Sequence, residues 1–442
     1  GSDFYQERLG KHGKVYKTHL LGRPVVRVVG AEHVRPVLLG EHISVSSCWP
    51  SSVQQMVGAD SLLGSTGDKH RLTKKLIISV FTPAVLASFV PRIQAVIRSH
   101  VERWCQMCSE EGFMHGFPAC QRLSADIAME VILGFGSGTR SRSDGHPNSE
   151  ELLTALITFV DNLFSVPARI PGGGFWKGMR AREVLLQAVR QKLDESSTRA
   201  DADFLSIVEL LQEVQCPDGT CLRDNRPVIE DNALEMFFAS YSTTSSALCS
   251  ALLCLGRDPE VLGKVEAELR EHGLMDERAE VTYDELNKLQ YVHCVNREVL
   301  RLYPPAGAGF RKAEQTLQIG GYQIPEGWTV AYSIRETQHT SSEFTDTERF
   351  QPERWMASEG DELKERLRFH YIPFGSGARA CVGRRLATMV QAIFVVELVR
   401  RSKWTVWNPW PTVKYVPVTR PADNLPVTFR HRTHTEENEA ER

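Results

Sequence analysis

The sequence predicts a mainly α-helical protein, a helix-rich domain with a minor β-sheet region. Apolar residues follow a helical period over most of Thr82–Leu274. Strand-like alternation is confined to the N-terminal portion and to segments that follow Pro304-Pro305. No linker divides the 442 residues. We therefore expect residues 1–430 to form one domain and the polar residues 431–442 to form a disordered tail.

The N-terminal half shows strands first and helices afterwards. Lys14–Leu20 and Val25–Val29 read as two strands joined by a hairpin at Leu21-Gly22-Arg23-Pro24. Helices then follow one another with short connections. Polar breaks that are expected to be surface loops fall at Ser137–Asn148, Glu195–Asp203 and Cys216–Pro227.

The C-terminal half begins with a long apolar helix, Ile229–Leu255, which contains a run of small and hydroxylated residues at Ala239–Ser246. A second helix, Leu289–Leu302, stops at two prolines, because proline cannot continue a helix. Strands are expected at Leu317–Ile319 and Trp328–Ser333, and a helix is expected from Cys381 to about Arg401.

Composition excludes several classes of protein. A net charge of −3 is unlike the strong basic excess of most nucleic-acid-binding domains. The ten cysteines form no disulfide framework and no zinc-finger spacing, since Cys105-x-x-Cys108 has no second pair. Cys249, Cys254 and Cys294 lie in apolar helical runs that suit buried free thiols. A reducing setting is expected.

The N-terminus suggests that a membrane segment is missing. No stretch reaches the roughly 18 uninterrupted apolar residues of a membrane span. Gly1-Ser2 looks like a cloning remnant, and the chain then starts abruptly at Asp3. We expect a native N-terminal membrane anchor that this sequence lacks.

The most informative segment is Phe374-Gly375-Ser376-Gly377-Ala378-Arg379-Ala380-Cys381-Val382-Gly383. Glycines allow a backbone to pass close to a flat macrocycle with unusual φ angles. Backbone N–H groups near a cysteine sulfur tune its donor strength as a metal ligand. Arg379 is placed to bind a haem propionate, and Phe374 would shield the sulfur from water. The segment predicts a thiolate ligand for haem iron at Cys381.

This segment matches F-G-x-G-x-R-x-C-x-G, and over essentially its full length the chain resembles the cytochrome P450 superfamily. The resemblance implies the cytochrome P450 fold, haem b held by Cys381, and monooxygenase activity. Glu298 and Arg301 match the E-x-x-R motif, and Pro352-Glu353-Arg354-Trp355 matches P-E-R-F with tryptophan in place of phenylalanine. A buried Glu298–Arg301–Arg354 network behind the haem is implied.

Further haem contacts follow from position in the superfamily. Arg311 resembles the strand arginine that reaches a propionate, and His70 and Lys74 stand where the superfamily often has W-x-x-x-R. Gly375 and Gly383 would lie against the cofactor. A solvated basic helix face is the alternative for His70 and Lys74.

The oxygen-activating helix departs from the superfamily pattern A/G-G-x-D/E-T. Thr243 matches the threonine, but Ser242 replaces the acid. A hydroxyl relays a proton through water but does not supply one from a titrating carboxyl group. We expect activity to persist while the coupling of reductant to product suffers.

Several segments resemble the retinoic acid hydroxylase branch. They are Lys17–Pro24, Leu38–His42, Asn162–Pro167, Gly178–Arg182, Gly320–Pro325 and Asp423–Pro426. The branch implies oxidation of all-trans-retinoic acid, mainly at C4, which clears the hormone. The resemblance to this branch implies that the acid can be absent from an active enzyme, so Ser242 need not mark an inactive one.

A retinoid site needs a long apolar slot and one polar anchor. Segments that line the pocket across the family supply these candidate substrate contacts: Trp49, Gln54, Phe164, Phe237, Phe238, Ala306, Gly307 and Val416. The branch usually has an arginine soon after Trp49-Pro50, whereas Gln54 hydrogen-bonds a carboxylate without neutralising it. Retinal, retinol or another apolar acid are alternatives.

Partners and location are implied by the resemblance. Electrons would come from NADPH through NADPH-cytochrome P450 reductase, which would dock on Lys74, Lys75, Arg384 and Arg385 near the cysteine. The expected location is the cytosolic face of the endoplasmic reticulum membrane. Two alternative functions are a sterol or fatty-acid hydroxylase and a retinoid-binding haem protein with little turnover.

Overall fold

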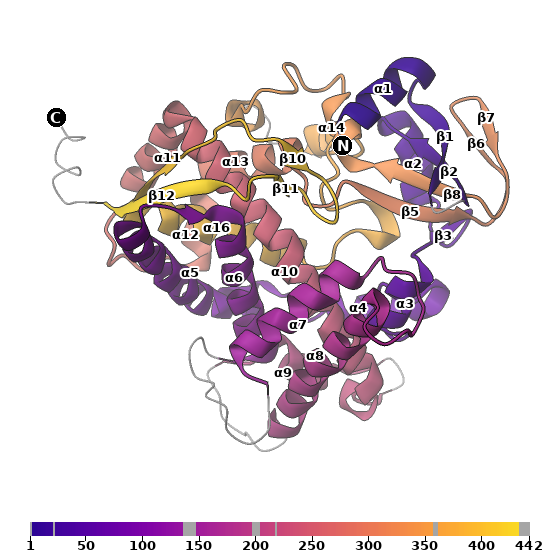
Figure 1. The fold of residues 1–442 in the computed structure, drawn as a ribbon, viewed down its shortest axis with the longest axis horizontal. Coiled ribbons are helices and arrows are strands. Elements are labelled where there is room, and N and C mark those ends of the chain that lie inside the picture. Colours follow the sequence, from indigo (N-terminus) through magenta and orange to yellow (C-terminus); the bar gives the residue numbers. More distant parts are fainter. Residues whose placement is uncertain are drawn as a thin grey trace.

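A long helix, α10 (Arg226–Arg257), runs through the helical part of the fold. The computed structural model describes residues 2–20, 23–135, 147–196, 204–216, 219–356 and 361–432. In Figure 1 the helices from the middle of the chain gather on one side of the molecule, and the main sheet lies with the first helices on the other. The candidate site lies where these two parts meet.

The helices are α1 (Ser2–His12), α2 (Ala31–Leu39), α3 (Ser51–Val57), α4 (Gly67–Ile78), α5 (Pro83–Glu111), α6 (Gly116–Ala128), α7 (Ser149–Asn162), α8 (Gly174–Ser196), α9 (Ile207–Gln212), α10, α11 (Pro259–Glu271), α12 (Tyr283–Lys288), α13 (Gln290–Leu302), α14 (Ile334–His339), α15 (Asp361–Leu367) and α16 (Arg384–Arg401). Shorter turns are η1 (Met129–Leu133), η2 (Leu222–Asp224), η3 (Pro352–Trp355) and η4 (Gly377–Arg379).

The strands are β1 (Val15–Leu20), β2 (Arg23–Val28), β3 (Val45–Ser47), β4 (Met114–His115), β5 (Ala308–Ala313), β6 (Leu317–Ile319), β7 (Tyr322–Ile324), β8 (Thr329–Ser333), β9 (Ser402–Val406), β10 (Val413–Lys414), β11 (Arg420–Pro421) and β12 (Pro426–His431). The largest sheet has the order β1-β2-β8-β5-β3. Within it β2 and β8 are parallel, and the other neighbouring pairs are antiparallel. This register sets Arg311 beside Ser47, which matters for the site.

The core forms around α10 because that helix is apolar on most of its faces. It packs against α6, α13 and α16, and these contacts bury residues such as Leu248 and Leu252 completely. By length and composition α10 could cross a membrane, but 78% of its apolar window is buried inside the fold. Its apolar character therefore serves the interior of the protein.

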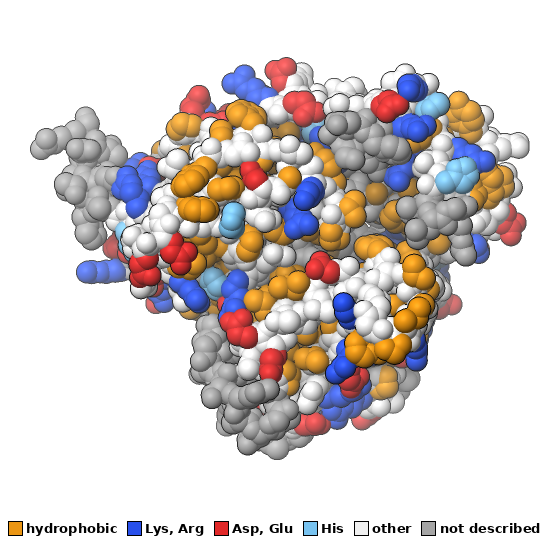
Figure 2. Space-filling view, in the orientation of Figure 1, with side chains coloured by type: hydrophobic (Ala, Val, Ile, Leu, Met, Phe, Trp, Pro, Cys, Tyr) orange, Lys and Arg blue, Asp and Glu red, His pale blue; other side chains and the backbone are white. Residues whose placement is uncertain are grey.

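Acidic and basic side chains are interspersed on the face of the molecule drawn in Figure 2. This distribution agrees with the net charge of −3.

The mainly α fold with a minor sheet is confirmed. Helices α10, α13 and α16 and strands β6 and β8 lie within two to three residues of their expected positions. The expected tail is wrong at its start, because His431 ends β12 and Arg432 is buried against Glu266. The other tail residues and the hairpin turn at 21–22 lie outside the described residues.

Candidate active site

An internal cavity of about 390 Å³ lies between α10, α4, β5 and the loop that carries Cys381. Cys381 lines this cavity, and the exposed surface of its side chain faces the cavity. Most of the remaining wall is apolar, including Ile127, Val131 and Ala247. A sulfur atom at the base of an apolar chamber is therefore the central feature of the site.

The cysteine loop is held in shape by backbone contacts. The Cys381 N–H donates to the Phe374 carbonyl at 2.9 Å. Gly375 and Gly377 have φ angles of +66° and +70°, which favour glycine. At Gly377 a side chain would also collide with the Leu38 carbonyl at the end of α2. The loop thus depends on its glycines for both conformation and close packing.

Lys74 ties α4 to the cysteine loop. Its Nζ donates to the carbonyls of Ala378 at 2.5 Å and Ala380 at 2.9 Å. Two of the three ammonium donors therefore serve the loop, which leaves one for the expected propionate contact. The lysine acts mainly as a brace beside the sulfur.

The Cys381 thiol lies in an environment with opposing effects on its charge. Burial raises the pKa of Cys381, while the Gly383 N–H and the cations Lys74 and Arg384 act to lower it. A metal ion bound at the sulfur deprotonates a thiol outright. The surrounding donors are thus suited to stabilise the thiolate that iron would require.

Two arginines line the cavity on the side of the sheet. Arg379 donates from Nε to Glu41 at 2.8 Å, from Nη1 to the Leu62 carbonyl at 3.0 Å and from Nη2 to the Ser65 carbonyl at 2.7 Å. Arg311 donates from Nη1 to the Phe310 carbonyl at 2.8 Å. Each guanidinium has five N–H groups, so both keep donors for a ligand.

The residues fit haem. Arg311 Nε and Glu41 Oε2 lie 2.8 Å apart but out of line for a hydrogen bond, and both are buried without another partner among the described residues. An anionic group entering the cavity would give the buried Arg311 fork the acceptor that it lacks. A haem needs a ligand for its iron, apolar walls around its ring and cations for its two propionates. The Cys381 sulfur, the apolar lining and the two guanidiniums provide these three features.

His70 also lines the cavity and pairs with His42, with 3.2 Å between His70 Nδ1 and His42 Nε2. Burial and the positive charges of Arg379 and Lys74 lower the pKa of His70 to about 3. In this environment the ring is neutral near pH 7, so it donates one hydrogen bond rather than a charge.

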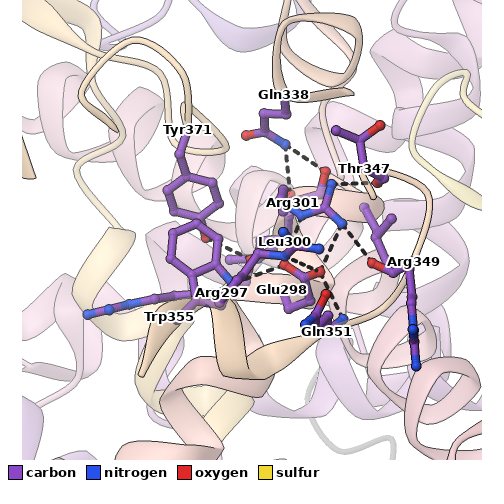
Figure 3. A network of polar contacts seen from close by, with 12 residues as sticks. Arg297, Glu298, Leu300, Arg301, Gln338, Thr347, Arg349, Gln351, Trp355 and Tyr371 are labelled. Atoms are coloured by element: carbon purple, nitrogen blue, oxygen red, sulfur yellow. Dashed lines mark hydrogen bonds and ion pairs between the residues drawn. The ribbon is translucent and has the colours of Figure 1, made fainter. Parts of the chain in front are cut away.

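Glu298 is the centre of a buried network of polar contacts (Figure 3). Glu298 accepts from Arg301 Nε and Nη2, each at 2.8 Å, and from Arg354 Nε at 3.0 Å. The Gln351 N–H and the Trp355 indole N–H also donate to it, each at 3.0 Å. The structure therefore brings together the three residues that the motifs linked, and adds Trp355.

Thr243 lines the cavity and Ser242 does not. The Thr243 hydroxyl donates to the Ala239 carbonyl at 2.7 Å, which leaves its oxygen free to accept a hydrogen bond on the cavity side. The Ser242 hydroxyl donates to the Phe238 carbonyl at 3.3 Å. The replacement at 242 thus removes an acid from a position beside the chamber rather than inside it.

Of the expected substrate contacts, Trp49 and Ala306 line the cavity. The other six expected contacts do not: Gln54, Phe164, Phe237, Phe238, Gly307 and Val416. Phe164 and Val416 are 51% and 77% exposed on the outer surface. Gln54 turns back to the Trp49 carbonyl at 3.1 Å. Phe237 is fully buried, and Phe238 packs on Phe159 in the helical core.

Sequence reasoning missed several polar residues of the site. Glu235 lines the cavity and accepts from the Leu63 N–H at 2.8 Å. Ser124 and Gln391 line it with buried oxygen atoms that have no partner among the described residues. Helical spacing from Thr243 signals Glu235, because residues four and eight positions earlier lie on nearby faces. Ser124 and Gln391 come from other helices and give no such signal.

A cysteine sulfur facing an apolar chamber, with two arginine forks beside it, defines a haem-thiolate protein. The cytochrome P450 family model matches residues 2–418, and the chain belongs to this family. It is therefore a cytochrome P450 monooxygenase that binds haem b through the Cys381 thiolate.

Similar proteins agree over nearly the whole chain. Cytochrome P450 26B1 of Danio rerio is 38% identical over 97% of this chain and 82% of its own length. Cytochrome P450 26C1 of Mus musculus is 38% identical over 97% of this chain and 84% of its own. The solved structure of retinoic acid bound cyanobacterial CYP120A1 has a TM-score of 0.86 at 27% identity, covering 97% of this chain and 94% of that one.

The bound haem supplies the cleavage of dioxygen with two electrons and two protons, which puts one oxygen atom into a substrate C–H bond and releases the other as water. The protein's own residues prepare the chamber for this. Lys74 holds the cysteine loop in place, and the apolar wall excludes bulk water. The Thr243 hydroxyl lines the cavity, and its oxygen can accept a hydrogen bond there.

Proposed function

We propose that this cytochrome P450 hydroxylates an elongated, apolar carboxylic acid, with all-trans-retinoic acid as the leading substrate and C4 as the site of oxidation. The observation that carries the proposal is the largely apolar cavity of about 390 Å³ that Cys381 lines. A polyene chain with one polar end matches this apolar lining.

The comparisons support the same substrate class. The solved structure at 27% identity is that of a retinoic acid bound cyanobacterial protein, CYP120A1. Two curated relatives, cytochrome P450 26B1 of Danio rerio and cytochrome P450 26C1 of Mus musculus, each match 97% of this chain at 38% identity. Clearance of the hormone by oxidation follows from this substrate.

The carboxylate end of the substrate needs a partner other than Gln54. The cations that line the cavity are Arg311, Arg379 and Lys74, and the neutral His70 lies beside them; all four are close to the cysteine loop or its arginines. Neutral side chains with a hydrogen-bonding group also line the cavity: Ser47, Trp49, Ser124, Ser240, Thr243, Thr244, Tyr332 and Gln391. Neutral donors select less strictly for a carboxylate than an arginine does, so retinal and retinol are the nearest competing substrates.

Roles for the haem-binding residues belong to the same proposal. Arg311 and Arg379 would bind the propionates, with His70 and the last donor of Lys74 as supplements. Phe374, Gly375 and Gly383 would face the cofactor from the cysteine loop. Thr243 would guide protons.

The electron donor would be NADPH-cytochrome P450 reductase, and the site of action would be the cytosolic face of the endoplasmic reticulum membrane. Lys75, Arg384 and Arg385 are exposed next to the cysteine loop, and we call them the proximal basic patch. Lys74 is only partly exposed and is bound to the loop, so it contributes little to a docking surface.

The test is turnover with reductase, NADPH and each of three retinoids: all-trans-retinoic acid, retinal and retinol. Mass spectrometry should show a hydroxylated product of the acid, formed faster than those of the other two. Arachidonic acid and cholesterol serve as probes of the fatty-acid and sterol alternatives. Product from either of these and none from a retinoid would refute the proposal.

Ser242 motivates one further outcome, a retinoid-binding protein with little turnover. Spectral titration with all-trans-retinoic acid measures binding separately from product formation. A spectral shift without product, while reductase still reduces the haem, would favour the binding protein over the hydroxylase.

A further inference from the structure

Glu41 is a buried carboxylate that both arginines of the cavity share. It lies between α2 and β3, and its side chain is 1% exposed. Oε1 accepts from Arg379 Nε at 2.8 Å and from the Ser47 N–H at 3.2 Å. Oε2 lies 2.8 Å from Arg311 Nε. One carboxylate therefore bridges two guanidiniums that come from separate parts of the chain.

The bridge joins three segments that meet only in the folded protein. Glu41 follows α2, Arg311 lies on β5, and Arg379 ends η4 in the cysteine loop. The pairing of Ser47 with Arg311 brings the segment after Glu41 against β5. At the other side, Gly377 packs against the Leu38 carbonyl, just before Glu41. Glu41 thus couples the sheet to the loop that carries the cysteine.

The charges explain why a shared anion is needed. The side chains of Arg311 and Arg379 are 5% and 9% exposed, so water screens their mutual repulsion weakly. Burial lowers the pKa of Arg379, and the hydrogen bond to Glu41 opposes this effect. Removing the acid would leave two buried cations side by side, which is among the costliest arrangements in a protein interior.

The bridge also fixes where the forks point. Arg379 is held by Glu41 at Nε and by two loop carbonyls at Nη1 and Nη2, so the plane of its guanidinium is set. Arg311 is held between Glu41 and the Phe310 carbonyl, over the Tyr332 ring. Both side chains line the cavity, so the N–H groups that make no hydrogen bond within the protein are available to a ligand there.

We propose that Glu41 is a positioning residue for the cofactor, which holds the Arg311 and Arg379 forks in their propionate-binding orientation and remains beside the propionates after haem binds. Removal of the Glu41 charge would have two opposite effects on haem binding. It would relieve the repulsion between Glu41 and the two haem propionates, and it would free the Arg311 and Arg379 guanidiniums to leave their propionate-binding orientation. The structure favours release as the larger effect, because Glu41 contacts both arginines directly. The inference does not depend on the identity of the substrate.

Haem loss measures this role without any assay of turnover. The purified holoproteins are mixed with excess apomyoglobin, which captures released haem, and the transfer is followed by absorbance. Glu41→Gln keeps the shape of the side chain and removes its charge, and we expect release at least tenfold faster than in the unmodified protein. Equal or slower release would overturn the proposal.

The matched control is Glu32→Gln. Glu32 is an acid on α2 whose side chain is 53% exposed and pairs with Lys14 on the surface. Its haem release should stay within about twofold of the unmodified protein, as expected for a surface substitution. A Glu32→Gln release as fast as that of Glu41→Gln would show a general effect of lost charge and would overturn the specific role.

A second readout separates positioning beside the cofactor from a purely structural role. Removal of a negative charge near haem favours the reduced iron, so the reduction potential of Glu41→Gln should shift to more positive values. Glu41→Asp keeps the charge with a shorter reach. It should release haem about threefold faster with little change in potential. If Glu41→Gln yields no holoprotein, an unchanged haem release in Glu41→Asp would overturn the proposal.

Discussion

Hydrogen bonds to the buried Glu298 carboxylate join α13 to the segment that carries Arg354 and Trp355. Glu298 accepts five hydrogen bonds, and one of them comes from the Trp355 indole. The superfamily motif has phenylalanine at this position, which cannot donate. The tryptophan therefore completes the coordination of an acid that is fully buried.

Trp355→Phe should destabilise the protein although it restores the more usual motif residue. A hydrogen bond to a charged group contributes about 1.5–3 kcal/mol, and we expect a loss of that order in the free energy of unfolding. Urea denaturation measures it. Trp404→Phe is the matched control, because the Trp404 indole donates to the neutral Leu252 carbonyl at 3.1 Å. Equal losses in the two variants would contradict a special role for Trp355.

Glu235 is a second buried acid, and it should give stability a particular pH dependence. Burial raises the pKa of Glu235 to about 7, against the opposing hydrogen bond from the Leu63 N–H. The folded state then holds a proton that the unfolded state releases above about pH 4.5. The protonated Glu235 therefore contributes fully to the free energy of unfolding below about pH 4.5. This contribution, up to about 3 kcal/mol, is lost as pH rises through 7.

Glu235→Gln should remove this component, so its stability relative to the unmodified protein should improve between pH 4.5 and 7.5. Glu209→Gln provides the opposite sign. Burial opposes ionisation there, but hydrogen bonds from Lys192 and Ser206 outweigh it and lower the pKa of Glu209. That contribution is lost as pH falls below about 4.5. Thermal melts at a series of pH values measure the stability of each variant relative to the unmodified protein. If this difference changed with pH in the same direction for Glu235→Gln and Glu209→Gln, the opposite pKa shifts of the two acids would be wrong.

Among the elements, α10 shows how far the sequence leads and where it stops. The hydroxylated run and Thr243 could be recognised from spacing and motif. The residues of α10 that lie on the same side as Thr243 could also have been predicted, since each residue of a helix is turned by about 100° from the one before it. On that basis Met236, Ala239 and Ala247 lie near Thr243, while Phe237 and Phe238 point well away from it. Position in the family predicts that Phe237 and Phe238 contact the substrate, whereas helical phase turns both away from the cavity, as the structure has them.

Ser242 and Thr244 each lie about 100° from Thr243, on opposite sides of it, and of these two only Thr244 lines the cavity. We expect Ser242→Glu to supply the missing acid and raise the ratio of product to hydrogen peroxide by about twofold or more. Thr243→Ala should lower that ratio, because it removes the oxygen that faces the cavity.

Peroxide release and product should be measured together for both variants and for the unmodified protein. Equal coupling in Ser242→Glu and in the unmodified protein would show that protons arrive by a route that avoids position 242. Ser124 and Gln391, with their unpartnered buried oxygen atoms in the cavity wall, would then be the next residues to test.

At the scale of the whole molecule, motifs predicted what lies within one segment, and pairing between segments decided the rest. The cysteine loop, the Glu298 motif and the mainly α class came from local patterns. The Glu41 bridge could not be predicted, because it needs the register of β3 on β5 and the packing of α2 on the cysteine loop. The exposed positions of Phe164 and Val416 likewise depend on the tertiary path of their loops.

The proximal basic patch leads to a prediction about the assembled electron-transfer complex. Lys75, Arg384 and Arg385 present positive charge next to the cysteine loop, and an acidic flavoprotein would be steered toward it. Charge reversal by Arg384→Glu with Arg385→Glu should slow haem reduction by NADPH and reductase about tenfold or more at low salt. Stopped-flow absorbance measures this rate.

The effect should shrink as ionic strength rises, because salt screens exposed charges over about 10 Å at 0.1 M. Arg98→Glu with Arg103→Glu changes the net charge equally on the exposed face of α5, outside the patch, and should alter the rate by less than about twofold. If both double variants slowed reduction alike, total charge and not the patch would steer the reductase. An unchanged rate in the patch variant at low salt would place the docking surface elsewhere.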